Sequence, residues 1–250
     1  MTLGSPLPAL RLLTRLPLAF GPPDDAEAVA ASVGYFPLVG LALGAMLALL
    51  DALLGALLDR QVVDALLLLA LALATGLFHL DGLMDRADGL LAPVERERRL
   101  EIMRDSHAGA FGVAALALML LIEYAALGAL PAGRRGAALL LMGISSRWSA
   151  LALAGLFPYA RPAGTGKAVH DGATPLRFAL GTALAGVCAG VVAGADGVAG
   201  LGWVAIVSIG FGWLVARRLG GLTGDVYGAG VVVAESASLI AAPLLLTPHG

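Results

Sequence analysis

The sequence predicts an all-α, polytopic integral membrane protein, a helical bundle with about seven transmembrane helices. Hydrophobic residues make up 59% of the 250 residues and the mean hydropathy is +0.88, whereas charged residues make up only 14%. Apolar runs long enough to cross about 30 Å of hydrocarbon recur along the chain. This composition excludes an ordinary soluble domain, so the lipid bilayer is the expected partner and no nucleic acid is expected.

The apolar runs define the predicted elements of one membrane domain, residues 1–250. Residues 1–30 are broken by Pro6, Pro8 and Pro17, which favours an interfacial N-terminal segment over a signal peptide. Glycine-rich spans suit packing within one protomer or between protomers, so a homo-oligomer stays among the expectations. The predicted spans lie at roughly 31–58, 62–80, 110–130, 136–157, 176–194, 198–219 and 229–247.

The distribution of Lys and Arg predicts the orientation. With seven spans, one side of the membrane carries twelve of these residues and the other side only Arg60, Arg134 and Arg135. Cytoplasmic loops carry the excess of positive charge. We therefore expect a multi-pass membrane protein with a defined orientation. Its N-terminus, a catalytic loop at 81–109 and the loops at 158–175 and 217–228 are expected in the cytoplasm.

An acidic motif at the end of the second apolar run is the strongest chemical signal. If the segment is helical, 100° per residue places Asp81, Asp85 and Asp88 on a common face roughly 60° wide. Carboxylates this close repel one another and need a cation. Hard oxygen ligands suit Mg²⁺, which shares its remaining coordination positions with substrate phosphates. The alternative is a solvated acidic helix end, which the apolar flanks disfavour.

Two further segments on the predicted cytoplasmic side carry groups suited to phosphate or metal binding. Arg104, Asp105 and Ser106 follow a charge-rich stretch, where the alternative is a solvated connector. The segment 220–225 follows two arginines and enters the last span, and its alternative is a plain glycine turn. The glycines permit a nest of backbone N–H groups that can hold phosphate oxygens. The aspartate of the segment can complete the coordination shell of a metal ion. The residues concerned are Gly221, Thr223, Gly224 and Asp225.

Ionisable residues inside the predicted spans need partners. Arg147 is expected either to pair with Glu123 or Glu235, or to contact a phosphate from within the bundle. Asp51, Asp59 and Asp64 lie toward the non-cytoplasmic ends of their helices and are expected at the interface. His79 adjoins the acidic motif and is a candidate general base, although a continuous helix would point it about 160° away from Asp81.

These residues together resemble the cobalamin synthase family, the adenosylcobinamide-GDP ribazoletransferases of the inner membrane. The resemblance covers nearly the whole chain and is densest at FHLDGL (78–83) and LEIMRDS (100–106). It continues through Asp85, the residues 87–89, 109, 111–112, 14–17, 36–40, 146–147, 219–221 and 223–225, and Glu235.

The resemblance implies that α-ribazole or its 5′-phosphate is joined to adenosylcobinamide-GDP. GMP is released and adenosylcobalamin or its 5′-phosphate is formed, with Mg²⁺ required. A ribose hydroxyl would attack a pyrophosphate, a reaction helped by positioning and by cations on the phosphoryl oxygens. Asp81, Asp85 and Asp88 are then the expected metal ligands, with Asp105 and Asp225 in reserve. Arg104, Ser106, Arg147, Gly221, Thr223 and Gly224 are the expected substrate contacts, with His79 beside them.

Two other functions are alternatives. A CDP-alcohol phosphotransferase uses a related acidic motif, and residues 85–92 match its first half, but Pro93 stands where that motif has Arg. A secondary transporter would place its charges near the midplane on the broken helices of two matching halves. Here the acids gather at one membrane face, which favours the transferase.

Overall fold

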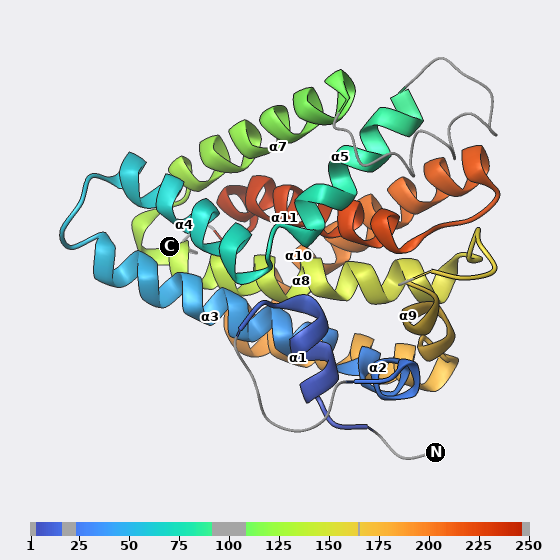
Figure 1. The fold of residues 1–250 in the computed structure, drawn as a ribbon. Helices are drawn as coiled ribbons and strands as arrows, with labels where there is room; N and C mark the ends of the chain where they lie inside the picture. The colour runs from blue at the N-terminus through green and yellow to red at the C-terminus, as the bar shows by residue number, and fades with distance from the viewer. Residues whose placement is uncertain (1–3, 17–23, 92–108, 165, 247–250) are drawn as a thin grey trace.

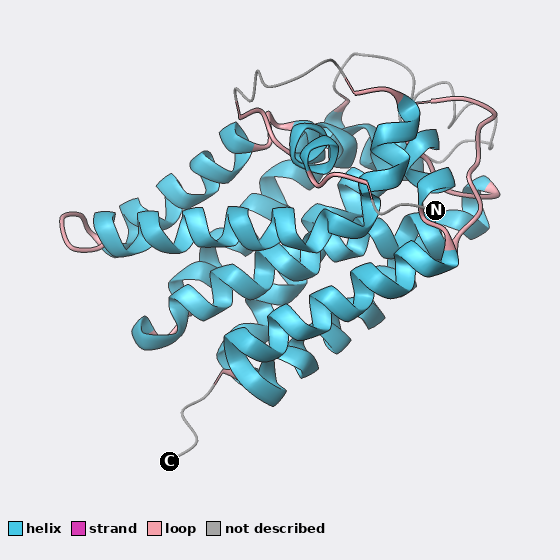
Figure 2. Cartoon of the chain, turned by 90° about the horizontal axis from the view of Figure 1, so that it is seen from below, coloured by secondary structure: helices cyan, strands magenta, loops and turns pink. Residues whose placement is uncertain are grey.

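The computed structural model describes residues 4–16, 24–91, 109–164 and 166–246 and is helical along this part of the chain (Figures 1 and 2). The predicted all-α membrane bundle is thereby confirmed. The main helices are α1 (Leu7–Leu13), α2 (Ala26–Ser32), α3 (Phe36–Leu54), α4 (Arg60–Ala74), α5 (Phe78–Leu91), α7 (Ala110–Gly128), α8 (Arg135–Leu156), α9 (Lys167–Gly172), α10 (Pro175–Leu219) and α11 (Gly224–Leu245).

Among the described residues, five helical segments are long and apolar enough to cross a membrane, or six if α4 and α5 form one bent span. The 45-residue helix α10 contains non-helical residues, Ala193 and Gly194. A Cβ atom on Gly197 would lie 2.1 Å from the carbonyl oxygen of Ala189, which requires the chain to reverse there. When the two arms of α10 are counted separately, the total reaches the predicted seven.

The second predicted span, 62–80, ends earlier than expected. Gly76 and Leu77 adopt positive φ angles of 62° and 60°, which end α4 and start α5 at a bend of 90°. Residues 78–80 therefore open α5 instead of completing the span. The first part of the expected loop 81–109 is also helical, because α5 continues to Leu91.

Helix α8 lies at the centre of the bundle, between α3 and α11 (Figure 1). Its contact with α3 depends on glycine: a Cβ atom on Gly40 would lie 2.0 Å from the carbonyl oxygen of Gly143. Small residues let membrane helices approach closely and gain van der Waals contact. The central position of α8 explains why Arg147, in its middle, is completely buried.

The N-terminal segment is more deeply packed than the interfacial anchor expected from the sequence. Ala9 and Leu13 of α1 are buried in the same core as Phe36 and Leu151. Helix α1 lies close to α2 and α3 (Figure 1).

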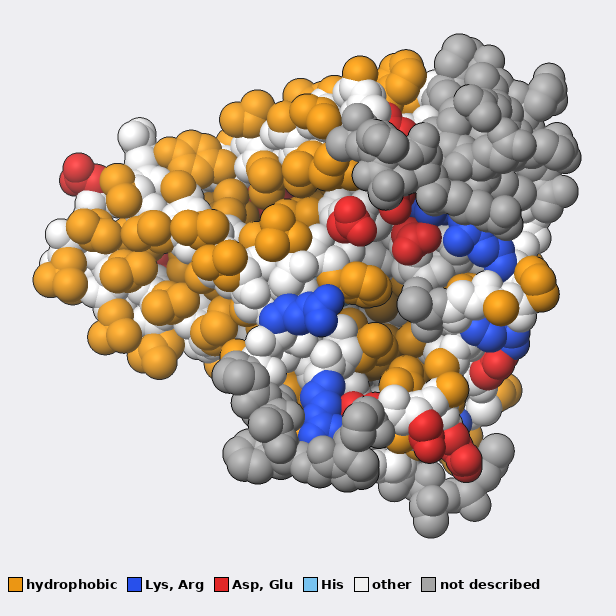
Figure 3. All heavy atoms as spheres, in the orientation of Figure 1, with side chains coloured by type: hydrophobic (Ala, Val, Ile, Leu, Met, Phe, Trp, Pro, Cys, Tyr) orange, Lys and Arg blue, Asp and Glu red, His pale blue; other side chains and the backbone are white. Residues whose placement is uncertain are grey.

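Exposed apolar side chains cover much of the outer surface, as a bilayer-embedded protein requires. Leu69, Val191, Ile206 and Leu244 are more than half exposed. In Figure 3 such side chains extend over α3, α4 and α7, whereas acidic and basic side chains gather toward α5 and α9. The charged end of the bundle is therefore where a site for charged ligands is to be sought.

Candidate active site

The acidic residues predicted to act together lie on one continuous helix. Helix α5 runs unbroken from Phe78 to Leu91, which is the condition for the three carboxylates to share a face. Along it Asp81 is exposed, Asp85 is half-buried and Asp88 is buried. The carboxylates thus pass from the surface of the bundle into its interior.

The start of α11 lies directly against this helix. A Cβ atom on Gly82 would lie 2.7 Å from the carbonyl oxygen of Asp225, so only glycine allows the two backbones to approach this closely. The Nη2 atom of Arg86 donates to a carboxylate oxygen of Asp225 at 2.8 Å. Asp85 lies within electrostatic reach of Asp81, Asp88, Asp225 and Arg86. Residues far apart in sequence thereby form one charged site.

Asp88 has a structural contact that the sequence did not reveal. Its two carboxylate oxygens accept hydrogen bonds from the backbone N–H groups of Gly109, at 2.8 Å, and Gly112, at 2.9 Å. These groups belong to the first turn of α7, whose unpaired N–H groups and positive dipole end favour a carboxylate. A Cβ atom on either glycine would lie within 2.3 Å of that carboxylate. Asp88 therefore joins α5 to the start of α7.

The carboxylates suit Mg²⁺ in chemistry and in location. Asp81, Asp85 and Asp225 supply hard oxygen atoms at the charged end of the bundle, and Asp85 is already surrounded by like charges. No group of three or more His, Cys, Asp or Glu side chains within metal-binding distance occurs among the described residues. Asp105, like Arg104 and Ser106, lies outside the described residues.

A loop after α8 closes the site from the other side. Leu222 donates its N–H to Pro158 at 2.8 Å, and Ala160 donates to Leu222 at 2.7 Å. A Cβ atom on Gly221 would lie 2.7 Å from the Pro158 carbonyl oxygen, so glycine is needed for this pairing. The segment 220–225 was expected to offer free backbone N–H groups to a phosphate, but the N–H of Leu222 is thus already used in this pairing. The Thr223 hydroxyl is buried and has no hydrogen-bond partner among the described residues.

Tyr159 fixes this loop against the start of α11. Its hydroxyl lies beside the backbone N–H groups of Gly224 and Gly166, and its ring stacks on His170 with centroids 5.6 Å apart. Burial raises the pKa of the Tyr159 hydroxyl, so the group stays neutral at physiological pH. The loop is thereby held rigidly enough to present the residue that follows the pairing.

That residue is Arg161, which the sequence analysis counted only as a loop charge. Its Nε and Nη2 atoms are buried, and neither has a hydrogen-bond partner in the described part of the chain. Its charge acts on Arg86. Two guanidinium groups that repel one another beside buried, unsatisfied N–H groups are suited to an anion such as a phosphate. No local motif marks Arg161, because only the pairing of Tyr159 with Leu222 brings it to the site.

Arg147 has the acidic partner that one of its two interpretations required. Its Nη1 atom donates to Glu235 at 2.5 Å and to the Ser146 hydroxyl at 2.9 Å. Glu123, the other candidate, instead accepts a hydrogen bond from Ser236 at 2.9 Å. This pairing inside the bundle supports the structural interpretation of Arg147, although its buried Nε and Nη2 atoms, like those of Arg161, have no hydrogen-bond partner among the described residues.

His79 lies on the side of α5 that faces the protein interior. It is 4% exposed, and its ring packs edge-on against Phe78 at 5.7 Å. Asp81, in contrast, is exposed. The continuous helix thus separates the imidazole from the exposed carboxylate, as the predicted angle of about 160° requires.

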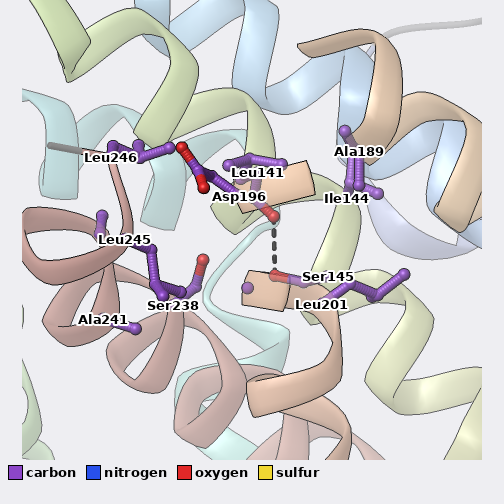
Figure 4. A pocket seen from close by; sticks show the side chains of 12 residues that line it. Leu141, Ile144, Ser145, Ala189, Asp196, Leu201, Ser238, Ala241, Leu245 and Leu246 are labelled. Atoms are coloured by element: carbon purple, nitrogen blue, oxygen red, sulfur yellow. Dashed lines mark hydrogen bonds between the residues drawn. The ribbon is translucent and has the colours of Figure 1, made fainter. Parts of the chain in front are cut away.

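A pocket between α8, α10 and α11 lies away from the charged end of the bundle (Figure 4). It is lined mainly by apolar side chains, together with Asp196, Ser238 and Ser145, whose hydroxyl donates to the Leu141 carbonyl at 2.7 Å. Its location gives it no part in the site on α5 and α11.

The fold and the site together define a polytopic membrane protein with an acidic and arginine-rich site suited to phosphate chemistry. Residues 5–243 match the family model described as CobS, cobalamin-5-phosphate synthase. The chain belongs to this family, as the resemblance in its motifs predicted.

Similar proteins extend over almost the full length of the chain. An adenosylcobinamide-GDP ribazoletransferase of Desulfitobacterium hafniense (strain Y51) is 40% identical over 246 residues, 96% of each chain. Proteins of the same description from Roseiflexus sp. (strain RS-1) and Pseudomonas paraeruginosa (strain PA7) are 38% and 39% identical, covering 95% and 97% of this chain and 90% and 98% of their own. No solved structure matches the chain.

Proposed function

We propose that this protein is an adenosylcobinamide-GDP ribazoletransferase, which joins α-ribazole or its 5′-phosphate to adenosylcobinamide-GDP and releases GMP. Family membership and full-length relatives of that description support the activity. The main structural support for this active site is the contact of α5 with the start of α11, where Arg86 pairs with Asp225 beside Asp85. The product is adenosylcobalamin or its 5′-phosphate.

The proposed metal ligands are Asp81, Asp85 and Asp225, with Asp105 completing the set. When bound there, Mg²⁺ would neutralise the phosphoryl oxygens on which negative charge gathers. Asp88 was expected in the same group, and we propose that it acts chiefly through α7, since both of its oxygens already accept backbone hydrogen bonds. The contact of Asp88 with α7 would fix the position of α5 so that Asp85 faces the substrate.

The proposed pyrophosphate contacts come from the opposite side of the site. Arg161 offers two buried N–H groups, and Thr223 offers a buried hydroxyl at the start of α11. Gly221 and Gly224 hold the backbone there, and the N-terminus of α11 adds its positive dipole end. Arg104 and Ser106 stay as proposed contacts from the preceding segment. Arg147 is proposed to position α11 through Glu235.

The experiment that tests this function measures GMP release by the purified protein. With adenosylcobinamide-GDP, α-ribazole and Mg²⁺ together, we expect GMP and a cobalamin product in equal amounts. Omitting α-ribazole or chelating Mg²⁺ should stop both. A membrane carrier would instead accumulate the substrate in sealed vesicles without forming GMP, and that result would contradict the proposal.

We also propose that the site faces the cytoplasm of a bacterial inner membrane, because the charge distribution places its loops there. Cysteines at Ala163 and Leu57, both exposed and on opposite ends of the bundle, make a matched pair in a Cys188→Ala background. An impermeant thiol reagent added to intact spheroplasts should label the cysteine at 57 but not that at 163. The reverse pattern would invert the topology.

A further inference from the structure

A largely apolar pocket lies beside the charged site, at the level where α11 begins. Its empty space measures about 430 Å³, a volume that includes the open mouth of the pocket. It is bounded by α1, α3, α5, α8, α9 and α11. Most of its wall is hydrocarbon, and the side chains that argue for its role are Leu13, Phe36, Phe78, His79, Tyr227 and Val231.

Among the lining residues only His79 and Tyr227 carry polar side chains. The side chain of Tyr227 is 4% exposed, and its hydroxyl is buried without a hydrogen-bond partner in the described residues. A buried unsatisfied hydroxyl is destabilising, so its presence in the wall of the pocket points to a ligand that supplies an acceptor.

The pocket adjoins the proposed site of the reaction. Gly224 and Gly228 line it, and the next residue after Gly224 is Asp225, which pairs with Arg86. Tyr159, whose hydroxyl lies beside Gly224, has its ring 6.3 Å from that of Tyr227. A ligand in the pocket would therefore have its polar end directed toward the carboxylates and arginines.

We propose that this pocket binds the base of the acceptor nucleoside, a flat and mostly apolar nitrogen heterocycle, while its ribose extends toward Asp85 and Asp225. The inference rests on the proposed function and assigns the acceptor subsite within it. Phe36, Phe78 and Val231 would enclose the ring, and the Tyr227 hydroxyl would donate to its free ring nitrogen. A stacked aromatic ring and one satisfied donor suit such a base.

The chemistry of the pocket excludes the other ring systems of the two substrates. Guanine presents several donors and acceptors at its edge, and burying them against hydrocarbon would leave most of them without a hydrogen-bond partner, which is unfavourable. The corrin ring carries polar amide side chains around its rim and meets the same obstacle. Of the ring systems in the two substrates, the acceptor base has the fewest polar atoms. It therefore suits a pocket with only two polar side chains among its lining residues.

The test measures binding and turnover separately for each substrate. Tyr227→Phe removes only the hydroxyl, and Val231→Phe narrows the pocket; Tyr124→Phe on α7 is the matched control, since Tyr124 is not among the lining residues. Loss of one neutral hydrogen bond predicts that Tyr227→Phe weakens α-ribazole binding by about 3- to 10-fold. Its KM for adenosylcobinamide-GDP should stay unchanged, and its melting temperature without ligand should rise, because Phe removes the unsatisfied hydroxyl. In Val231→Phe, a riboside with a smaller base should be preferred over α-ribazole.

Equilibrium dialysis with α-ribazole, with and without adenosylcobinamide-GDP, keeps the two proposals distinguishable. If the wild-type protein releases no GMP but binds α-ribazole through Tyr227, the function is wrong and the pocket assignment stands. If the wild type turns over while both folded variants keep the normal affinity and KM for α-ribazole, the pocket assignment is overturned. A copurified lipid that disappears only in Val231→Phe, with unchanged α-ribazole binding, would likewise overturn it and assign the pocket to lipid.

Discussion

Two clusters of charged residues lie at opposite ends of this bundle, and they differ in how completely they are paired. At one end Arg135 donates from Nε to Asp51 at 3.0 Å, pairs with Asp64, and donates to the Leu127 carbonyl at 2.6 Å. Arg60 adds a second bond to Asp51 at 2.6 Å. Asp64 is 1% exposed, so its carboxylate is enclosed by protein at this end of the bundle. We call these residues the closed cluster.

The other cluster, which we call the open cluster, consists of Asp81, Asp85, Asp225, Arg86 and Arg161. Arg86 and Asp225 pair, but Asp81 is exposed and two buried nitrogen atoms of Arg161 have no partner among the described residues. Buried charge is costly unless it is compensated. The closed cluster is compensated within the protein, whereas the open cluster is not, and we propose that a cation and a polyphosphate complete it.

The largest effect is expected in the closed cluster. Arg135→Met leaves Asp51 and Asp64 without their shared partner, and removing one member of a buried ion pair costs about 3–5 kcal/mol. Thermal unfolding in detergent should report this loss, with the GMP release of the surviving folded fraction unchanged. Equal damage to activity per folded molecule would show that the two clusters are coupled. Combining Arg135→Met with Asp64→Asn should recover part of the stability.

The second effect belongs to the open cluster. Asp85→Asn and Asp81→Asn each remove a proposed ligand charge without removing packing, so turnover should fall by at least roughly 100-fold, as for other preorganised electrostatic groups. Asp59→Asn, an exposed acid at the opposite end, is the matched control. Activity should be measured across a Mg²⁺ titration beside melting temperature. Near-normal turnover of both variants at saturating Mg²⁺ would remove the metal assignment.

A smaller effect is expected at Arg147. It shows whether this residue is paired within the protein, as in the closed cluster, or contacts the substrate, as proposed for the open cluster. The bond to Glu235 predicts that Arg147→Met and Glu235→Gln are coupled in stability by on the order of 2 kcal/mol. A double-mutant cycle on melting temperature measures this coupling, and a GMP assay on the same variants measures catalysis. Absence of coupling, together with a raised KM for adenosylcobinamide-GDP, would return Arg147 to the role of phosphate contact.

The smallest effect is expected at Arg161. Arg161→Lys keeps the charge but loses the planar fork, so kcat/KM for adenosylcobinamide-GDP should fall by about tenfold, equivalent to about 1.4 kcal/mol. The affinity for α-ribazole and the melting temperature should be unaffected. Arg177→Lys, near the start of α10, provides the control. If both variants behave like the wild type, the open cluster does not use Arg161.

Local sequence patterns predict some features of this fold and miss others. Hydropathy predicted both arms of α10, since each arm is a long apolar run, and the helical period predicted that the acids of α5 share a face. The early end of α4 was missed because Leu77, which any pattern reads as apolar, adopts a positive φ angle. The partner of Arg147 was narrowed to two glutamates by depth alone, and packing selected Glu235.

The sequence by itself determined the membrane class, the approximate spans, the family and the acidic helix that carries Asp81 and Asp85. These properties follow from composition and from periodicities within one segment, which are encoded locally. Only the tertiary structure decided that Asp225 meets Arg86, that Asp88 holds the start of α7, and that Arg161 enters the site. Each of these contacts joins different segments of the chain, and the absence of a side chain at a few glycines, such as Gly82, allows the segments to approach.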